Sequence, residues 1–314
     1  MPDENLIIKA VLDELQKVII GKKDVLEKIL MAILAGGHIL IDDIPGVGKT
    51  TISIAFAKVL GLAQKRLQFT PDILPSDITG FSMYDRNRNE FCYVEGAAMT
   101  NILLADEINR TSPRTQSALL EVMEEGSVTV DSVTRSVPKP FIVIATQNPA
   151  GSIGTQELPE SQVDRFLIRI SIGYPEVEEE IAILKGIREN PLNNIKSILN
   201  AEELLALQQK TKQIYVDDSI YEYIAKLAKA TRQSPAVMLG ISPRGSIAAI
   251  RMTQARAMLY GRNYARPDDV VAVLKPVLQH RLIMDNRASF ERNSLDKVFA
   301  EIVQTVPLPK ITEH

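Results

Sequence analysis

The segment GGHILIDDIPGVGKT, residues 36–50, decides the fold of this chain. Within it, His38 to Asp42 is a short, largely apolar run that predicts a strand, and residues 51–60 form a helical pattern that ends at Gly61. The turn at 45–50 is thus a glycine-rich loop that follows a strand and opens a helix. This context favours a phosphate-binding loop over a glycine turn that merely caps a helix.

The residues of this loop suit a triphosphate and Mg²⁺. Gly46 and Gly48 let the backbone wrap an anion, and the N–H groups at the start of the helix offer partial positive charge to a β-phosphate. Lys49 supplies a full charge to the β- and γ-phosphates, and Thr50 offers its hydroxyl to Mg²⁺. Asp43 stands where the motif has its first glycine.

Further apolar runs along the chain predict the rest of a sheet. They are short, apolar throughout and separated by helical patterns such as 113–125, which is typical of a parallel sheet covered on both faces. The fold class is therefore α/β. Residues 127–137 instead alternate around Asp131-Ser132 and predict an inserted hairpin. The runs lie at 102–105, 141–145 and 167–172, with a weaker one at 66–69.

The composition changes after residue 175, because helical patterns dominate from there to the end. We therefore expect an α/β domain over residues 1–175 and a smaller all-helical domain over 176–314. Within the second domain, Asn200 and Glu203 have the spacing of a capping box, and Pro243 stands where a helix can begin.

Polar side chains follow two of the predicted strands. Asp106 and Glu107 come directly after the run at 102–105, and Asn148 follows the run at 141–145. Ligands collect at the carboxyl ends of strands in an open α/β sheet, so Asp106 is placed to hold Mg²⁺ through water and Glu107 to orient and deprotonate an attacking water. Asn148 can position that water without adding charge, although Asn-Pro is also a turn signal.

Two arginines have less usual places. Arg244 falls in the first turn of a predicted helix, where the helix dipole disfavours a cation, so it needs an anionic partner. Arg165 directly follows Asp164, and from the residues alone a local ion pair between them is the simpler interpretation.

Together these motifs resemble those of the AAA+ ATPases, and more narrowly those of the MoxR family, over nearly the whole chain. The resemblance implies a P-loop NTPase domain with a five-stranded parallel sheet and a smaller all-helical lid domain. The matching blocks are GGHILIDDIPGVGKT (36–50), TPDILPSDITG (70–80), ADEINRTSPRTQSALLEVMEEG (105–126), PFIVIATQNP (140–149), LPESQVDRF (158–166) and GISPRG (240–245).

The resemblance also implies a role for each matching residue, with ATP and Mg²⁺ as cofactors. Glu107 would activate water, Asn148 would be the first sensor, and Arg244 the second sensor, reaching from the lid to the γ-phosphate. Arg165 would be an arginine finger on nucleotide held by the neighbouring subunit, in place of a local pair. The expected nucleotide-binding residues are Ile20, Gly21, Gly46, Val47, Gly48, Lys49, Thr50, Thr51 and Asp106, of which Thr50 and Asp106 also hold the metal.

The function that the resemblance implies is ATP hydrolysis by a ring, a hexamer, that remodels client proteins as a chaperone. The client would be another chain, one with a von Willebrand factor A domain. In such rings, segments 71–80 and 127–137 would point toward the pore or the upper face.

Four other functions are alternatives to this one. A magnesium-chelatase-like motor subunit would share the architecture. A nucleic-acid motor is disfavoured, because the net charge is −3, aromatic residues are 5% of the chain, and the basic residues near the insertion segments are interleaved with acids. A slow nucleotide-switched binding module is disfavoured by the intact set of predicted catalytic residues, and a GTPase by the lack of an Asn-Lys-x-Asp motif.

Composition excludes several other classes of protein. The 314 residues include one cysteine, Cys92, and three widely spaced histidines, which cannot form an intrachain disulfide or a cysteine-rich zinc site. The first eight residues carry acids where a signal peptide needs bases, and the longest apolar stretch, 29–41, is too short to span a bilayer. We therefore expect a cytoplasmic protein.

Overall fold

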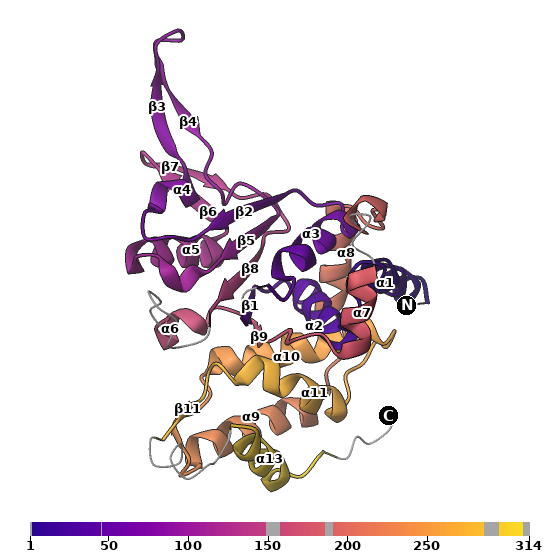
Figure 1. Ribbon diagram of the computed structural model, residues 1–314. Helices are drawn as coiled ribbons and strands as arrows, with labels where there is room; N and C mark the ends of the chain where they lie inside the picture. Colours follow the sequence, from indigo (N-terminus) through magenta and orange to yellow (C-terminus); the bar gives the residue numbers. More distant parts are fainter. Residues whose placement is uncertain (1, 45, 149–157, 186–190, 286–294, 310–314) are drawn as a thin grey trace.

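The computed structural model describes residues 2–44, 46–148, 158–185, 191–285 and 295–309. Its centre is a sheet in the order β2-β5-β8-β1-β9, in which every neighbouring pair of strands is parallel (Figure 1). The predicted α/β fold with a five-stranded parallel sheet is therefore confirmed. The strands are β1 (Ile39–Asp42), β2 (Gln64–Gln68), β5 (Ile102–Asp106), β8 (Ile142–Gln147) and β9 (Ile168–Ile170).

Alternate side chains of the sheet enter two separate cores. In β1, Ile39 and Ile41 belong to one core and Leu40 to the other, as the two-residue repeat of a strand requires. Because helices cover both faces, the central strands are apolar throughout. The helices of the first core are α1 (Pro2–Gln16), α2 (Lys23–Leu34) and α3 (Lys49–Val59), and α5 (Pro113–Glu125) covers the second.

Local signals set the ends of α5, the helix that follows the predicted acidic pair. The Ser112 hydroxyl accepts from the Thr115 N–H at 3.3 Å, and Pro113 occupies the first turn. The helix stops at Gly126, which adopts the left-handed conformation. A 3-10 turn, η1 (Ile108–Arg110), joins β5 to this helix.

The carboxyl-terminal part is mainly helical. The capping box of Asn200 and Glu203 forms as predicted, with each side chain bonded to the other's N–H, and helices begin at Pro243 and Pro267. A two-stranded ribbon, too short to be seen in the sequence pattern, also lies here. The elements are α7 (Val177–Lys185), η3 (Pro191–Asn194), α8 (Ala201–Lys212), α9 (Asp218–Gln233), β10 (Val237–Leu239), α10 (Pro243–Leu259), α11 (Pro267–Leu278), β11 (Ile283–Met284) and α13 (Leu295–Thr305).

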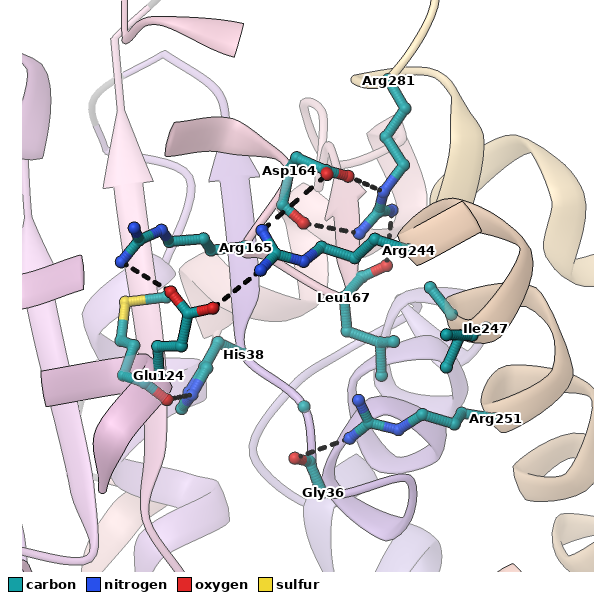
Figure 2. Close-up of a pocket in the computed structure, with 13 residues that line it drawn as sticks. Gly36, His38, Glu124, Asp164, Arg165, Leu167, Arg244, Ile247, Arg251 and Arg281 are labelled. Carbon is teal, nitrogen blue, oxygen red and sulfur yellow. Dashed lines mark hydrogen bonds and ion pairs between the residues drawn. The ribbon is translucent and has the colours of Figure 1, made fainter. Parts of the chain in front are cut away.

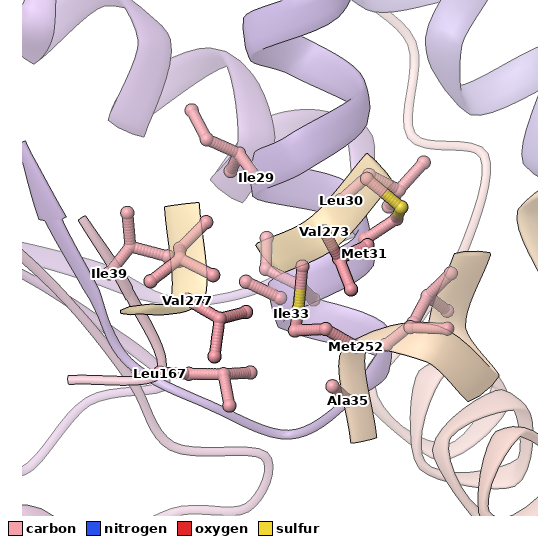
Figure 3. Packing of buried hydrophobic residues seen from close by; sticks show 14 of the residues in the cluster. Ile29, Leu30, Met31, Ile33, Ala35, Ile39, Leu167, Met252, Val273 and Val277 are labelled. Atoms are coloured by element: carbon pink, nitrogen blue, oxygen red, sulfur yellow. The ribbon is translucent and has the colours of Figure 1, made fainter. Parts of the chain in front are cut away.

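The first core continues from the sheet into these helices. Figure 3 shows Ile33 of α2 close to Met252 of α10, and Ile39 of β1 close to Val277 of α11. All four side chains are fully buried. The position of the helical part relative to the sheet is therefore fixed by apolar packing, while the predicted domain boundary at residue 175 stays a prediction. None of the helices in the described ranges is long and apolar enough to cross a membrane.

Two hairpins extend from the α/β part. β6 (Ser127–Val130) and β7 (Val133–Ser136) form the predicted hairpin, with Asp131 and Ser132 at positive φ in its turn. β3 (Phe81–Asp85) and β4 (Glu90–Val94) form a second one, which the sequence did not predict. Figure 1 shows it projecting away from the sheet, above the short helix α4 (Pro75–Thr79) that lies in the predicted insertion. The last short helix, α6 (Glu160–Val163), precedes β9.

Candidate active site

The loop between β1 and α3 has the backbone of an anion cradle. Gly46 and Gly48 adopt φ values of +91° and +90°, which only glycine reaches without strain. A Cβ atom added to either glycine would meet nothing within 4 Å, so the space beside the loop is open. Gly48 caps α3, whose first N–H groups therefore face this space. These features fit a bound phosphate; Pro45 lies outside the described residues.

Lys49 is held inside the loop. Its side chain belongs to a residue that is 7% exposed, and Nζ donates to the backbone oxygen of Asp43 at 2.6 Å. Burial lowers the pKa of Lys49 below its ordinary value, and the nearby carboxylates, Asp106 first among them, act in the opposite direction. With one of its three donors bonded to the backbone, the buried ammonium has donors left for phosphate oxygens.

Glu107 and Asn148, predicted from separate strands, are in contact. Asn148 Nδ2 donates to Glu107 Oε1 at 3.1 Å, and Arg110 Nη1 donates to Oε2 at 2.9 Å. Glu107 has a φ of +58°, unusual for a residue with a side chain, and its N–H donates to the Thr146 hydroxyl at 2.9 Å. The Asn148 Oδ1 atom is buried without a partner among the described residues. Such an atom fits a site that admits a water or a ligand donor.

Asp106 lies at the same edge of the sheet. Its Oδ1 accepts from the Thr146 hydroxyl at 2.6 Å, and its Oδ2 accepts from Arg66 Nη2 at 2.7 Å. Arg66 was not predicted, because its strand, β2, gave the weakest signal. Thr50 lies in the first turn of α3. No group of three or more His, Cys, Asp or Glu in the described part of the chain could hold a metal alone. Thr50 and Asp106 thus fit Mg²⁺ that takes its other ligands from nucleotide oxygens and water.

The remaining predicted nucleotide-binding residues lie around the loop. Val47 packs against the first core, and Thr51 is half-buried in α3. Ile20 and Gly21 lie in the turn between α1 and α2, where Gly21 has a φ of +74°. A Cβ on Gly21 would overlap the carboxylate of Glu179, so α7 closes over this turn. The adenine-binding role of Ile20 and Gly21 stays a prediction.

Arg165 and Arg244 lie where the parallel strands begin, which we call the amino edge of the sheet. The phosphate loop and the acidic pair lie where the strands end, the carboxyl edge. Leu167, two residues after Arg165, donates its N–H to the His38 oxygen at 2.8 Å, at the amino end of β1, whereas the phosphate loop follows the carboxyl end. The structure therefore brings Arg244 to Arg165 and not to the phosphate loop of its own chain. Figure 2 shows their guanidinium groups on two sides of the Glu124 carboxylate.

The contacts of Asp164 differ from the local pair considered from the sequence. Arg281 Nε donates to Asp164 Oδ1 at 2.6 Å, and Arg244 Nη1 lies 3.9 Å from Oδ2. Arg165 instead donates to the Leu120 oxygen at 2.8 Å. These side chains line one pocket, the one drawn in Figure 2. Four arginines and two acids line it, so it carries excess positive charge. They are Arg165, Arg244, Arg251, Arg281, Glu124 and Asp164.

Among the charged residues that were not predicted from the sequence are Arg66, Arg110 and Glu124. Arg66 pairs with the predicted metal ligand Asp106, Arg110 with the predicted base Glu107, and Glu124 with both the predicted arginine finger and the predicted second sensor. Arg110 could have been found from its place three residues after Glu107 in a helical turn. Arg66 and Glu124 meet their partners only through tertiary structure.

Comparison with known proteins gives consistent matches. Residues 38–168 match the model of the ATPase family associated with various cellular activities (AAA), and residues 229–302 match an AAA lid domain. The chain is 47% identical to the uncharacterized protein YeaC of Bacillus subtilis over 97% of this chain and 95% of that protein. It is 39% identical to Chaperone MoxR1 of Mycobacterium tuberculosis over 95% of this chain and 81% of that protein.

The crystal structure of a protein from Cytophaga hutchinsonii is also similar. It shares 34% identity with this chain and superimposes with a TM-score of 0.91, covering 98% of this chain and 96% of that one. The two proteins therefore share both sequence and fold over the α/β part and the helical part. With its phosphate loop, acidic pair and lid, the chain belongs to the MoxR family of AAA+ ATPases.

Proposed function

We propose that this ATPase works as a ring in which ATP bound at the phosphate loop of one subunit is cleaved with the help of Arg165 and Arg244 of the next. The observation that carries the proposal is the separation of the two sets of residues. Loop, acidic pair and Asn148 lie at the carboxyl edge of the sheet, and both arginines lie at the amino edge. A site with both sets then needs two chains.

At the carboxyl edge, each residue has a distinct part in the proposed reaction. The N–H groups around Gly48 and the Lys49 ammonium hold the phosphates, and Thr50 with Asp106 would hold Mg²⁺, which neutralises phosphate charge when bound. Glu107 orients a water and takes its proton, and the Asn148 amide fixes the direction of the Glu107 carboxylate.

At the amino edge, the arginines supply positive charge where negative charge develops in the transition state. In the isolated chain Glu124 pairs with both of them, and its single negative charge offsets one of their two positive charges. In a ring, the γ-phosphate of the neighbouring subunit would take that place. Hydrolysis would then depend on assembly, and activity per subunit would rise steeply with protein concentration.

The work done with this energy is proposed to be remodelling of client proteins by a hexamer. Support comes from the family resemblance and from the name of the relative Chaperone MoxR1. The proposed client is a separate chain with a von Willebrand factor A domain. The exposed apolar residues of the β3–β4 hairpin, Met83 and Phe91 among them, give such a client a surface to contact.

A mixing experiment tests the trans site. The variant R165A keeps its phosphate loop but cannot donate the finger, and E107Q keeps the finger but cannot activate water. Each alone should lose hydrolysis by about 100-fold or more, and an equimolar mixture should recover a substantial fraction. Arg114, exposed on α5, supplies the control variant R114A, which should resemble the wild type. Absence of recovery in assemblies that contain both variants would contradict the proposal.

The client is tested by capture. E107Q should stall with ATP and retain its client, whereas K49A, which cannot hold the phosphates, should not. Proteins with von Willebrand factor A domains should therefore be enriched on E107Q relative to K49A after purification from the native source. Equal recovery on both variants would count against a nucleotide-dependent client.

A further inference from the structure

We propose that Asp43 is a positioning residue that ties the phosphate loop to the connector, residues 171–174, which leads from β9 to α7. Through Asp43 the connector responds when Lys49 moves from a backbone acceptor to a phosphate. This inference rests on the proposed binding of ATP at the loop. The strict form of the loop motif has glycine at this position, so the carboxylate is an addition that needs an explanation.

One oxygen of the Asp43 carboxylate bonds to the connector, and the other bonds within the phosphate loop. Its Oδ2 accepts from the Ile172 N–H at 2.6 Å, from the Gly173 N–H at 2.8 Å and from the Ser171 hydroxyl at 3.1 Å. Its Oδ1 accepts from the Ile44 N–H at 2.9 Å. Asp43 is 7% exposed, so these charge-assisted bonds form away from water, where they are strongest.

The backbone of Asp43 contacts the catalytic parts of the site. Its oxygen is the acceptor of Lys49 Nζ at 2.6 Å, and its N–H donates to the Gln147 oxygen at 3.3 Å, next to Asn148. One residue therefore bonds to the phosphate-binding lysine through its oxygen and to the connector through its carboxylate. A change in the bond between Lys49 and the Asp43 oxygen therefore acts on the residue whose carboxylate holds the connector.

The far end of the connector lies on the turn proposed to bind adenine. Lys22 Nζ donates to the Tyr174 oxygen at 2.7 Å and lies 3.3 Å from Glu179 Oε2 of α7. The carboxylate of Glu179 also covers Gly21. The connector thus runs from the phosphate loop to the helix that closes over Gly21, and both ends face residues that a nucleotide would contact.

The Lys49 ammonium has three donors, one of which bonds the Asp43 oxygen, and a bound triphosphate would draw the ammonium toward its own oxygens. We infer that this displacement lengthens the bond to the Asp43 oxygen and that the carboxylate carries the change to Ile172 and Gly173. A glycine at position 43 would keep the loop able to bind phosphate but would leave both connector N–H groups without their acceptor. Asp43 therefore affects the coupling between nucleotide and connector more than nucleotide affinity.

The test compares D43G and the milder S171A with the wild type. Asp42, the next residue in the chain, pairs with Arg169, so D42N is the matched control. Three quantities are measured: affinity for a fluorescent ATP analogue, kcat and KM for ATP, and hydrogen exchange of the peptide 168–176 with and without Mg-ADP.

In the wild type, exchange of the connector amides should change when Mg-ADP binds. In D43G these amides should exchange about tenfold faster or more, the nucleotide response should vanish, and kcat should fall about tenfold while affinity changes less than about threefold. S171A, which loses one donor only, should shift the same quantities in the same direction by less. D42N should match the wild type in the nucleotide response.

Wild-type turnover in D43G, or a nucleotide response of the connector that persists in D43G, would overturn the inference. If D43G fails to fold, an S171A connector response identical to the wild type would overturn it. Failure of the proposed function looks different: K49A would then bind the ATP analogue as tightly as the wild type, whatever the connector does.

Discussion

Arg165 and Arg244 share one carboxylate. Arg165 Nη1 lies 3.0 Å from Glu124 Oε2, and Arg244 Nη2 lies 2.7 Å from Oε1. Two guanidinium groups from distant parts of the sequence would repel each other, and Glu124, near the end of α5, holds them together. Because α5 follows the acidic pair Asp106-Glu107 through η1, the helix joins the end of the sheet that carries this pair to the two arginines proposed to act on the next subunit.

The position of Arg244 predicts a separation of binding from turnover. In R244A, the affinity of dilute protein for ATP should stay within about twofold of the wild type, because Arg244 does not lie beside the loop of its own chain. At concentrations where the proposed ring assembles, kcat should fall about tenfold or more. Fluorescence titration and steady-state assays measure the two quantities. A large loss of affinity in the dilute protein would show that Arg244 acts on its own nucleotide.

The contact between Asn148 and Glu107 predicts similar chemistry in two variants. E107Q should bind ATP and lose hydrolysis. N148A should lower kcat about tenfold to 100-fold with little change in KM, because the carboxylate loses the amide that directs it. Single-turnover assays separate hydrolysis from product release. An equal loss of binding and hydrolysis in E107Q would refute its role in activating water.

The environment of His38 predicts that stability falls in mild acid. Nδ1 accepts from the Val143 N–H at 3.0 Å, so Nε2 carries the proton and donates to the Met123 oxygen at 3.0 Å. Burial lowers the pKa of His38 to about 4, from 6.5 in the unfolded chain. Below pH 6.5 the unfolded chain therefore binds a proton that the folded chain does not. The free energy of unfolding should decrease from pH 6.5 toward pH 4, by up to about 3 kcal/mol.

Urea unfolding at pH 7, about 6 and about 5 measures this slope. This range lies above 4.5, the ordinary pKa of carboxyls such as Glu4, whose loss of stabilising charge comes at lower pH. Burial shifts the pKa of His280 in the same direction, so H38Q should flatten the slope in part. A free energy of unfolding that is constant over this range would contradict the prediction.

The shared core predicts a large effect of a buried substitution. Ile33 of α2 is fully buried where the sheet and the lid helices meet, so I33A should lower the free energy of unfolding by about 2–5 kcal/mol. Leu6 of α1 is 65% exposed, and L6A should change it by less than about 0.5 kcal/mol. Equal effects of the two substitutions in urea unfolding would contradict the packing described.

Much of the fold follows from local sequence. The apolar runs predicted β1, β5 and β8 clearly, because a strand buried on both faces leaves no alternation to obscure it, whereas the half-buried β2 gave a weak signal. The ends of these strands placed Glu107 and Asn148 at the same end of the sheet. The β3–β4 hairpin was missed because its turn, residues 86–89, has no glycine, and Asn89 takes the positive φ instead. Its strands also lack a consistent polar face.

The arrangement of the arginines needed tertiary structure. The sequence gives no register between β2 and β5, which brings Arg66 to Asp106, and none between α10 and the sheet, which brings Arg244 to Glu124. Apolar packing of α10 on α2 sets the second of these. The partners of Arg66 and Arg244 depend on how whole helices and strands pack against each other. The spacing of motifs along the sequence does not contain that packing.

The β3–β4 hairpin is bonded to the rest of the α/β part at its base, and its outer half forms a separate two-stranded sheet. At its base the Tyr93 hydroxyl donates to the Thr79 oxygen at 2.6 Å, and the Arg135 guanidinium lies over the Tyr93 ring. Beyond that point its strands bond to each other in a sheet of their own. We therefore expect that the outer half can be lengthened, shortened or exchanged with that of a relative while the rest of the chain folds as before, and that such an exchange would change which protein the proposed client surface contacts.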